Sequence, residues 1–297
     1  TLDKTVNQDK EPYAIPRTVQ NTIPIRRIWP DGVFLCGSKY SKCWRFEDVN
    51  YAIAGKENKT AMFLDYSELL NSLDSGATAK ITINNRRINR ADFEKSILLR
   101  EAGDGLDGLR REYNEMLLGK ITGSENSMVQ ERYITISVHK RSVEEAKAYF
   151  ARVGTDLTAR LGKLSSRCTE LDAANRLRIF HDFFRAGEET SFRFDMNSSA
   201  KKGHGFKESF CPQSLEFKGR YFGMGARFGR ALYLQEYASY IKDSMVSELC
   251  ELNRSLMLSI DIIPIPTDEA VREMQNKMLG IETNVSNWQR RQNAANN

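Results

Sequence analysis

Two segments of this chain carry an apolar residue at every second position, and they constrain its fold more than any other feature. The segments are 78–84 and 133–138. A period of two is typical of a strand that buries one face and leaves the other polar. Strands of a doubly wound parallel sheet are buried on both faces instead. We therefore expect an α+β fold with mixed, largely antiparallel sheets and packed amphipathic helices.

Elsewhere along the chain, apolar residues recur at steps of three and four, which predicts helices that pack on the sheet. Ser142 and Glu145 have the spacing of a capping box, so one helix is expected to begin there. The others are expected at about 57–74, 105–121, 172–184 and 241–252. A turn at Pro30, Asp31 and Gly32 predicts a hairpin.

Changes in composition along the chain predict five regions. They are a flexible arm at 1–22, an α+β domain at 23–184, a long polar loop at 185–213, a subdomain of hairpin, helix and strand at 214–265, and a long connector helix at 266–297.

The connector helix should begin at Thr267 as its cap. Six of its apolar residues form a seam with heptad spacing over about two and a half heptads: Val271, Met274, Met278, Ile281, Val285 and Trp288. A coiled coil is usually inferred from three or four heptads, so packing on the chain's own core is the favoured interpretation. A helix that faces a partner or joins two domains is the alternative. Gly280 weakens the isolated helix, which therefore needs its seam buried.

The stretch 221–237 holds three glycines, Gly223, Gly225 and Gly229. A dinucleotide fingerprint needs its third glycine one position earlier and a helix after it. Here the residues after Gly229 suit a strand, so a hairpin with its turn at 226–229 is expected. No phosphate-binding loop of the Walker type occurs in the sequence. We expect this chain neither to bind nor to hydrolyse ATP.

The charge and the cysteines limit the classes of protein that fit. With 44 basic and 39 acidic residues, the net charge is +5, which suits nucleic acid or an acidic membrane face without proving either. The five cysteines form no C-x-x-C pair, which predicts free thiols in a reducing cytoplasm. No apolar run reaches the length of a membrane span, and no signal peptide is present.

A search for chemistry finds no catalytic, cofactor-binding or metal site. His139, His181 and His204 have no ligand or nucleophile partner in the pattern, so ordinary packing or surface positions are favoured for the first two. Zinc-ligand spacing is missing. Basic doublets lie on separate predicted elements, which indicates a solvated surface. A basic nucleic-acid-binding module nevertheless remains the alternative function.

Several stretches, in their order along the chain, resemble the amino-terminal region of the conjugation and type IV secretion ATPases (TraC/TrbE/CagE-like, the "VirB-four" type), in the form found in Gram-positive conjugative elements. They are TVQNTIPI at 18–25, DG at 31–32, YSKCWRFEDVNY at 40–51, FEKSI at 93–97, YNEML at 113–117, RYITI at 132–136, YFGMG at 221–225, GRALYL at 229–234 and RRQNAANN at 290–297.

This resemblance covers most of 18–297 and implies a docking and assembly domain. Such a domain binds inner-membrane components of the secretion channel, lies at the inner face of the cell membrane and helps the ATPase to oligomerise for DNA transfer. The catalytic motifs of the family, with their ATP and Mg²⁺, are expected in the motor beyond residue 297. No family catalytic residue falls on this sequence.

Overall fold

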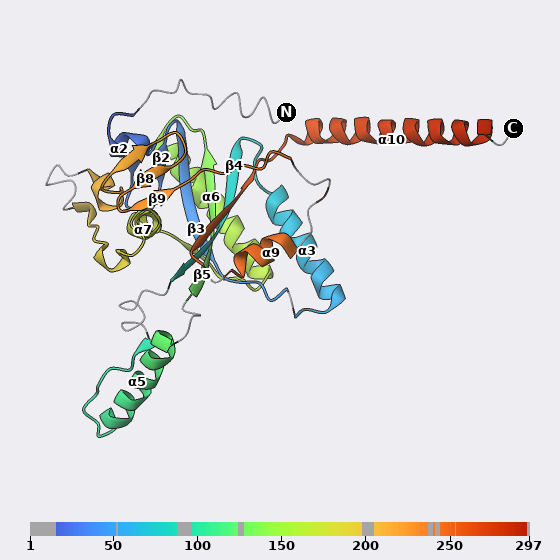
Figure 1. Cartoon of the computed structure of the whole chain (residues 1–297). Helices are drawn as coiled ribbons and strands as arrows, with labels where there is room; N and C mark the ends of the chain where they lie inside the picture. The colour runs from blue at the N-terminus through green and yellow to red at the C-terminus, as the bar shows by residue number, and fades with distance from the viewer. Residues whose placement is uncertain are drawn as a thin grey trace.

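The computed structural model describes residues 16–51, 53–87, 97–123, 128–197, 205–236, 240, 244–252 and 254–295. His204, the first fifteen residues of the predicted arm and residues 93–96 of the FEKSI motif lie outside them. The chain has an α+β fold in which a seven-stranded sheet runs in the order β1-β2-β3-β5-β4-β10, with β6 also paired to β3 (Figure 1). Every pairing among the described strands is antiparallel. The predicted fold class is confirmed.

The strands of the large sheet are β1 (Ile25–Ile28), β2 (Phe34–Cys36), β3 (Lys39–Phe46), β4 (Ala77–Arg87), β5 (Met128–Val138), β6 (Cys168–Glu170) and β10 (Leu256–Ile262). A small second sheet consists of β7 (Leu215–Phe217), β8 (Phe222–Met224) and β9 (Arg227–Gly229).

The α-helices are α2 (Val19–Thr22), α3 (Lys56–Asn71), α5 (Asp107–Gly123), α6 (Val143–Lys163), α7 (Ala173–Phe184), α9 (Ser244–Cys250) and α10 (Thr267–Ala295). Two 3₁₀ turns, η1 (Glu189–Ser191) and η2 (Phe206–Ser209), lie in the predicted long loop. Of the helix expected at 241–252, residues 241–243 lie outside the described residues, and α9 ends at Cys250, two residues earlier than expected.

One face of the sheet packs against α3 and α6 and forms the main core. The apolar residues of the alternating strands lie there, with Ile134 and Ile136 almost fully buried. Trp44 from β3 meets Phe150 from α6 edge to face at 6.3 Å between ring centroids. As predicted, Ser142 caps α6, because its side chain accepts a hydrogen bond from Glu145 N. The Glu145 carboxylate reaches back one residue further than expected, to Arg141 N at 3.3 Å.

The other face is covered by α7 along β1, β2 and β3, where a second apolar cluster forms. Its buried residues are Ile23, Ile25, Phe34, Ala173, Leu177, Phe210 and Cys211. The region 185–213 is therefore more than a polar loop, since Phe210 and Cys211 belong to this cluster and Phe192, Phe194, Met196 and Phe206 pack against it. Composition concealed this because the aromatic side chains are separated by polar residues.

The glycine-rich stretch forms the hairpin β8–β9, but its turn lies earlier than predicted. Met224 pairs with Arg227, which leaves Gly225 and Ala226 as a two-residue turn. Gly225 has the positive φ (+58°) that such a turn requires. Gly229 pairs in the strand, and a Cβ on it would lie 2.2 Å from the Phe222 ring. The strand predicted after Gly229 is absent from the described residues 230–236.

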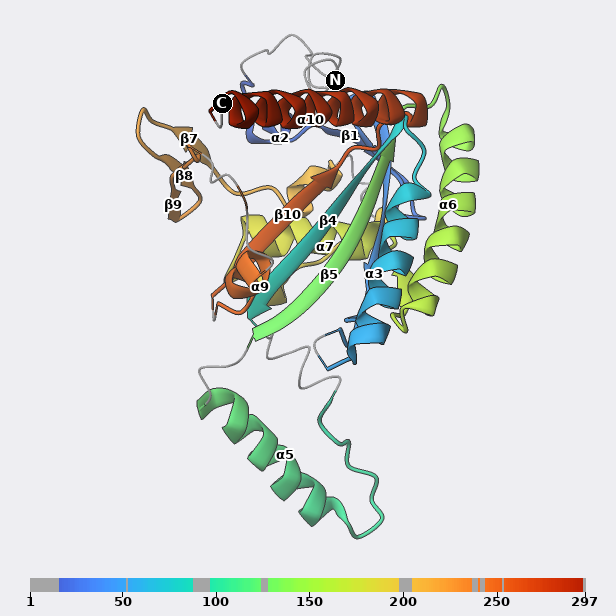
Figure 2. The same cartoon turned by 90° about the vertical axis from the view of Figure 1, so that its right-hand side faces the viewer.

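The long helix α10 leaves the end of β10 and extends away from the sheet (Figures 1 and 2). Pro266 O accepts the hydrogen bond of Ala270 N, so Pro266 is the cap and Thr267 is the first helical residue. The cap predicted at Thr267 was one residue late. The seam residues are all exposed, with fractions from 47 to 67%. Packing of the seam on the chain's own core, the favoured interpretation, is wrong.

Candidate interaction surfaces

Residues 97–123 form a lobe beyond the end of the β4–β5 pair (Figure 2). The two strands pair without a break from Ala77 opposite Val138 to Arg87 opposite Met128. The lobe consists of α5 and the segment 97–106, which folds back along the helix. It therefore lies apart from the main core, beyond the ends of β4 and β5.

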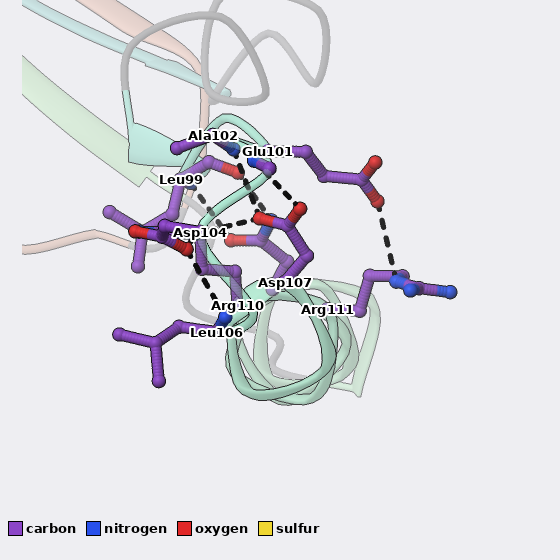
Figure 3. A network of polar contacts seen from close by, with 10 residues as sticks. Leu99, Glu101, Ala102, Asp104, Leu106, Asp107, Arg110 and Arg111 are labelled. Atoms are coloured by element: carbon purple, nitrogen blue, oxygen red, sulfur yellow. Dashed lines mark hydrogen bonds and ion pairs between the residues drawn. The ribbon is translucent and has the colours of Figure 1, made fainter.

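Charged groups fix the segment to the helix (Figure 3). Asp107 accepts hydrogen bonds from the backbone N–H groups of Ala102 and Gly103, both at 3.0 Å. Arg110 donates to Asp107 at 2.7 Å and also to Asp104. These bonds hold the pKa of both carboxyl groups below the usual range: that of Asp104 mainly through Arg110, and that of Asp107 mainly through Ala102 N–H and then Arg110.

The side of α5 that faces the segment is thus polar, and the neighbouring side carries the apolar stripe. Four stripe residues are exposed by 46 to 65%: Leu106, which immediately precedes α5, and Leu109, Tyr113 and Met116 on the helix. Ile97 and Leu99, on the folded-back segment, are exposed to a similar degree. A helix usually buries such a stripe, and an exposed apolar patch commonly marks an interaction site. We call these six residues the α5 patch.

A groove lies on the sheet face beside α7. It encloses about 630 Å³, and Phe180, Phe183 and Phe184 from α7 form its aromatic wall. Its floor carries hydroxyl groups from four strands: Ser41, Thr78, Thr82, Thr135, Ser137 and Ser259. The polar residues that alternate with apolar ones at 78–84 and 133–138 thus point to the face of the sheet that α7 leaves uncovered.

Arg176 is buried at the edge of this groove. Its Nη1 donates to Gly32 O at 2.7 Å and to Ser41 O at 2.8 Å, and its guanidinium lies 4.0 Å from the Phe34 ring centroid. Burial lowers the pKa of Arg176. Because it bonds to carbonyl groups on the hairpin turn and on β3, Arg176 ties α7 to both.

A smaller polar pocket near the lobe end of the sheet contains a partly buried ion pair. Arg86 Nε donates to Glu131 Oε2 at 2.8 Å, and Tyr133 Oη donates to the same oxygen at 2.7 Å. Burial raises the pKa of Tyr133, and the Glu131 charge raises it further. The phenol therefore remains protonated and acts as a hydrogen-bond donor.

His181, on α7, is buried. Its Nδ1 lies 3.2 Å from Asp182, and its Nε2 lies 3.5 Å from Ser191 Oγ. Asp182, His181 and Ser191 are thus connected as the residues of a catalytic triad are. The Ser191 hydroxyl, however, donates its hydrogen bond to Glu188 O at 2.7 Å. Phe192 packs against the ring at 5.1 Å. These contacts support the packing role that was favoured for His181. His139 lies immediately after the end of β5 and is exposed.

Among the residues that the structure describes, no group of three or more histidine, cysteine and acidic residues is placed to hold a metal ion. No helix in those ranges is both long and apolar enough to cross a membrane. The five cysteines are free thiols, as predicted.

The apolar surfaces thus lie on α5 and α10, at two separate projections of the molecule (Figure 1). Sequence periodicity identified both helices, but it did not indicate that their stripes would be exposed. Neither the models of known protein families nor the curated protein sequences give a match to this chain.

Proposed function

We propose that this chain is a docking and assembly domain of a conjugative type IV secretion ATPase. In this proposal it binds inner-membrane channel proteins, lies in the cytoplasm at the inner face of the membrane and helps the ATPase to oligomerise for DNA transfer. The family assignment rests on the resemblance of the sequence motifs. The observation that supports docking is the α5 patch, an exposed apolar surface on a lobe that lies apart from the main core.

The lobe has the physical properties of a preformed binding element. Asp107 and Arg110 already order the segment 97–106, so little conformational entropy remains to be lost on binding. Tyr113 lies in the stripe, and tyrosine is one of the residues that most often dominates binding energy at an interface. The net charge of +5 favours a position near an anionic membrane surface.

Site-specific cross-linking tests this function in donor cells that carry the gene in its own conjugative element. A photoreactive amino acid is placed at Leu109 or Tyr113, and in matched controls at Glu112 or Glu115, which are exposed elsewhere on α5. We expect cross-links to channel proteins of the element from the first pair and few from the controls. Equal labelling from all four positions, or none in the membrane fraction, contradicts docking through the α5 patch.

A functional readout complements the cross-links. Leu109→Asp/Tyr113→Asp places two charges in the patch without touching the buried core. We expect DNA transfer to fall at least about tenfold, which corresponds to about 1.4 kcal/mol of lost binding, while the melting temperature stays within about 2 °C of wild type. Normal transfer by this variant argues against the proposal.

The nucleic-acid-binding alternative makes a different prediction. Phosphate contacts give a linear fall of log K with log salt, whereas an apolar interface has a shallow salt dependence. Titration of the purified chain with duplex and single-stranded DNA at several salt concentrations measures this slope. Tight binding with a steep slope would favour the alternative.

A further inference from the structure

The exposed seam of α10 has the residue pattern of one strand of a coiled coil. Taking Val271 as position a of a heptad, Met278 and Val285 are also at a, and the remaining seam residues are at d. Both a and d positions are apolar through Trp288, and all six side chains are exposed. The helix thus presents one side of a coiled-coil interface, and the described part of this chain does not cover it.

The charges beside the seam match a second copy of the same helix. Lys277 occupies position g, and Glu282, five positions later, occupies position e. In a parallel two-stranded coiled coil, a g residue faces the following e residue of the partner helix. Lys277 of each copy would therefore face Glu282 of the other, giving two ion pairs. The other facing pairs are Ala270 with Gln275 and Asn284 with Gln289, which carry no charge.

An antiparallel pair lacks this complementarity. The register that aligns all six seam residues places Met278 opposite Ile281, and g then faces g while e faces e. Lys277 would meet Asn284, and Glu282 would meet Gln275, so neither charge has a partner across the interface. Since e and g charges set the orientation of coiled coils, the sequence of α10 selects the parallel arrangement.

We propose that α10 pairs in parallel and in register with α10 of a second copy of this chain. The inference rests on the assembly part of the proposed function and names the partner for it. Within one chain, Lys277 contacts Glu273 at 3.0 Å, but both side chains are largely exposed, and such a pair is weak enough to be exchanged. Gly280 disfavours the isolated helix, so burial of the seam also stabilises α10 itself.

A charge-exchange series tests the pairing by analytical ultracentrifugation of the whole 297-residue chain over a range of concentrations. Lys277→Glu and Glu282→Lys each place like charges opposite one another at two sites. We expect each to weaken the dimer at least about tenfold, because two attractive exposed pairs become repulsive; tenfold corresponds to about 1.4 kcal/mol. The double variant Lys277→Glu/Glu282→Lys reverses both charges and should restore the wild-type dissociation constant.

Apolar variants provide the second arm. Met278→Asp/Ile281→Asp should abolish dimerisation while the melting temperature of the monomer changes little, because both side chains are exposed in one chain. The matched control, Asn276→Asp/Thr283→Asp, adds the same charge on the opposite side of α10, at f positions, and should dimerise as the wild type does. Circular dichroism checks that helix content is similar in both monomers.

Three results would overturn the proposal. One is a chain that stays monomeric at every concentration, and another is a double exchange as weak as the single variants. The third is a seam that binds vesicles of phosphatidylglycerol and phosphatidylcholine equally in all charge variants without dimerisation, which would make it a membrane face. The photo-cross-linking from Leu109 to channel proteins is repeated in the same α10 variants. A variant that still cross-links but no longer dimerises has lost pairing and kept docking, so the two proposals fail separately.

Discussion

Asn114 holds the backbone of Leu99 through both atoms of its side-chain amide. Its Oδ1 accepts a hydrogen bond from Leu99 N at 2.9 Å, and its Nδ2 donates to Leu99 O at 2.8 Å. The pair closes the start of the folded-back segment onto the middle of α5. Leu99, itself exposed, is thereby kept against α5, the helix that carries Leu109 and Tyr113.

Asn114→Ala should release this segment without unfolding the main core. Each lost hydrogen bond contributes about 1 kcal/mol, so the Leu99 amide should exchange with solvent about tenfold faster or more. Hydrogen exchange followed by mass spectrometry measures this effect in peptides that span the segment. Glu115→Ala, on the next residue, is the control and should leave the exchange rate unchanged. Equal protection in both variants would contradict the clamp.

Gly32→Ala should be strongly destabilising. Gly32 has φ of +78°, and a Cβ there would lie 2.0 Å from Leu171 O, which is backbone and cannot rotate away. We expect a loss of more than about 2 kcal/mol in the free energy of unfolding, measured with urea. Gly162→Ala in α6 is the matched control, because a Cβ there meets nothing within 4 Å. It should be neutral or stabilise the protein by up to about 1 kcal/mol.

Glu131→Gln should change how stability depends on pH. Burial acts to raise the pKa of Glu131, but hydrogen bonds and charges, chiefly from Arg86, outweigh it and leave the pKa below its ordinary value. The ionised carboxylate thus stabilises the fold above its unfolded pKa of about 4.3, and this contribution is lost as the pH falls through the folded value. We expect the variant to lose about 1–2 kcal/mol at pH 7 and less at low pH.

Urea unfolding at pH 7 and at a pH below 4 checks this prediction. The difference in stability between Glu131→Gln and wild type should narrow on acidification. Glu112→Gln, on the exposed surface of α5, serves as the control and should follow the wild-type curve. A constant difference at both pH values would show that the ionised form of Glu131 contributes nothing.

The five thiols should react at different rates in the native protein. Burial raises the pKa of the Cys43 and Cys211 thiols, which are only 4 and 3% exposed. Little thiolate is present at these sites, so alkylation should be slowest there and faster at Cys250. In denaturant without reductant, all five should react. A thiol that stays blocked under those conditions would contradict the free state predicted from the spacing.

The parts of the fold that depend on local pattern could be predicted from the sequence. The alternation at 133–138 places Ile134 and Ile136 in the core because a strand points successive side chains to opposite faces. The position of Gly32 in the sequence likewise predicted the turn between β1 and β2. The β8–β9 turn was placed too late because several glycines offered a turn, and only the pairing of Met224 with Arg227 decides between them.

The interaction surfaces could be predicted only in part. Periodicity shows that α5 and α10 each have an apolar stripe, but it does not show whether another element of the chain covers the stripe. On α5, the polar side chains of Asp107 and Asn114 hold the neighbouring segment, and the stripe remains 46 to 65% exposed. Arg176 was missed because its partner Ser41 is 135 positions away in the sequence. No pattern of local spacing reports such a contact.

The unbroken pairing of β4 with β5 has a mechanical consequence for the lobe. Arg87 and Met128 end the two strands at the same edge of the sheet, on the side of the lobe, so a pull from that side acts along both strands together. Between β3 on one side and β10 on the other, such a load acts in shear and is shared by many backbone hydrogen bonds at once. Forces that reach the ends of β4 and β5 are therefore transmitted to the sheet, and the strands are not unzipped one bond at a time.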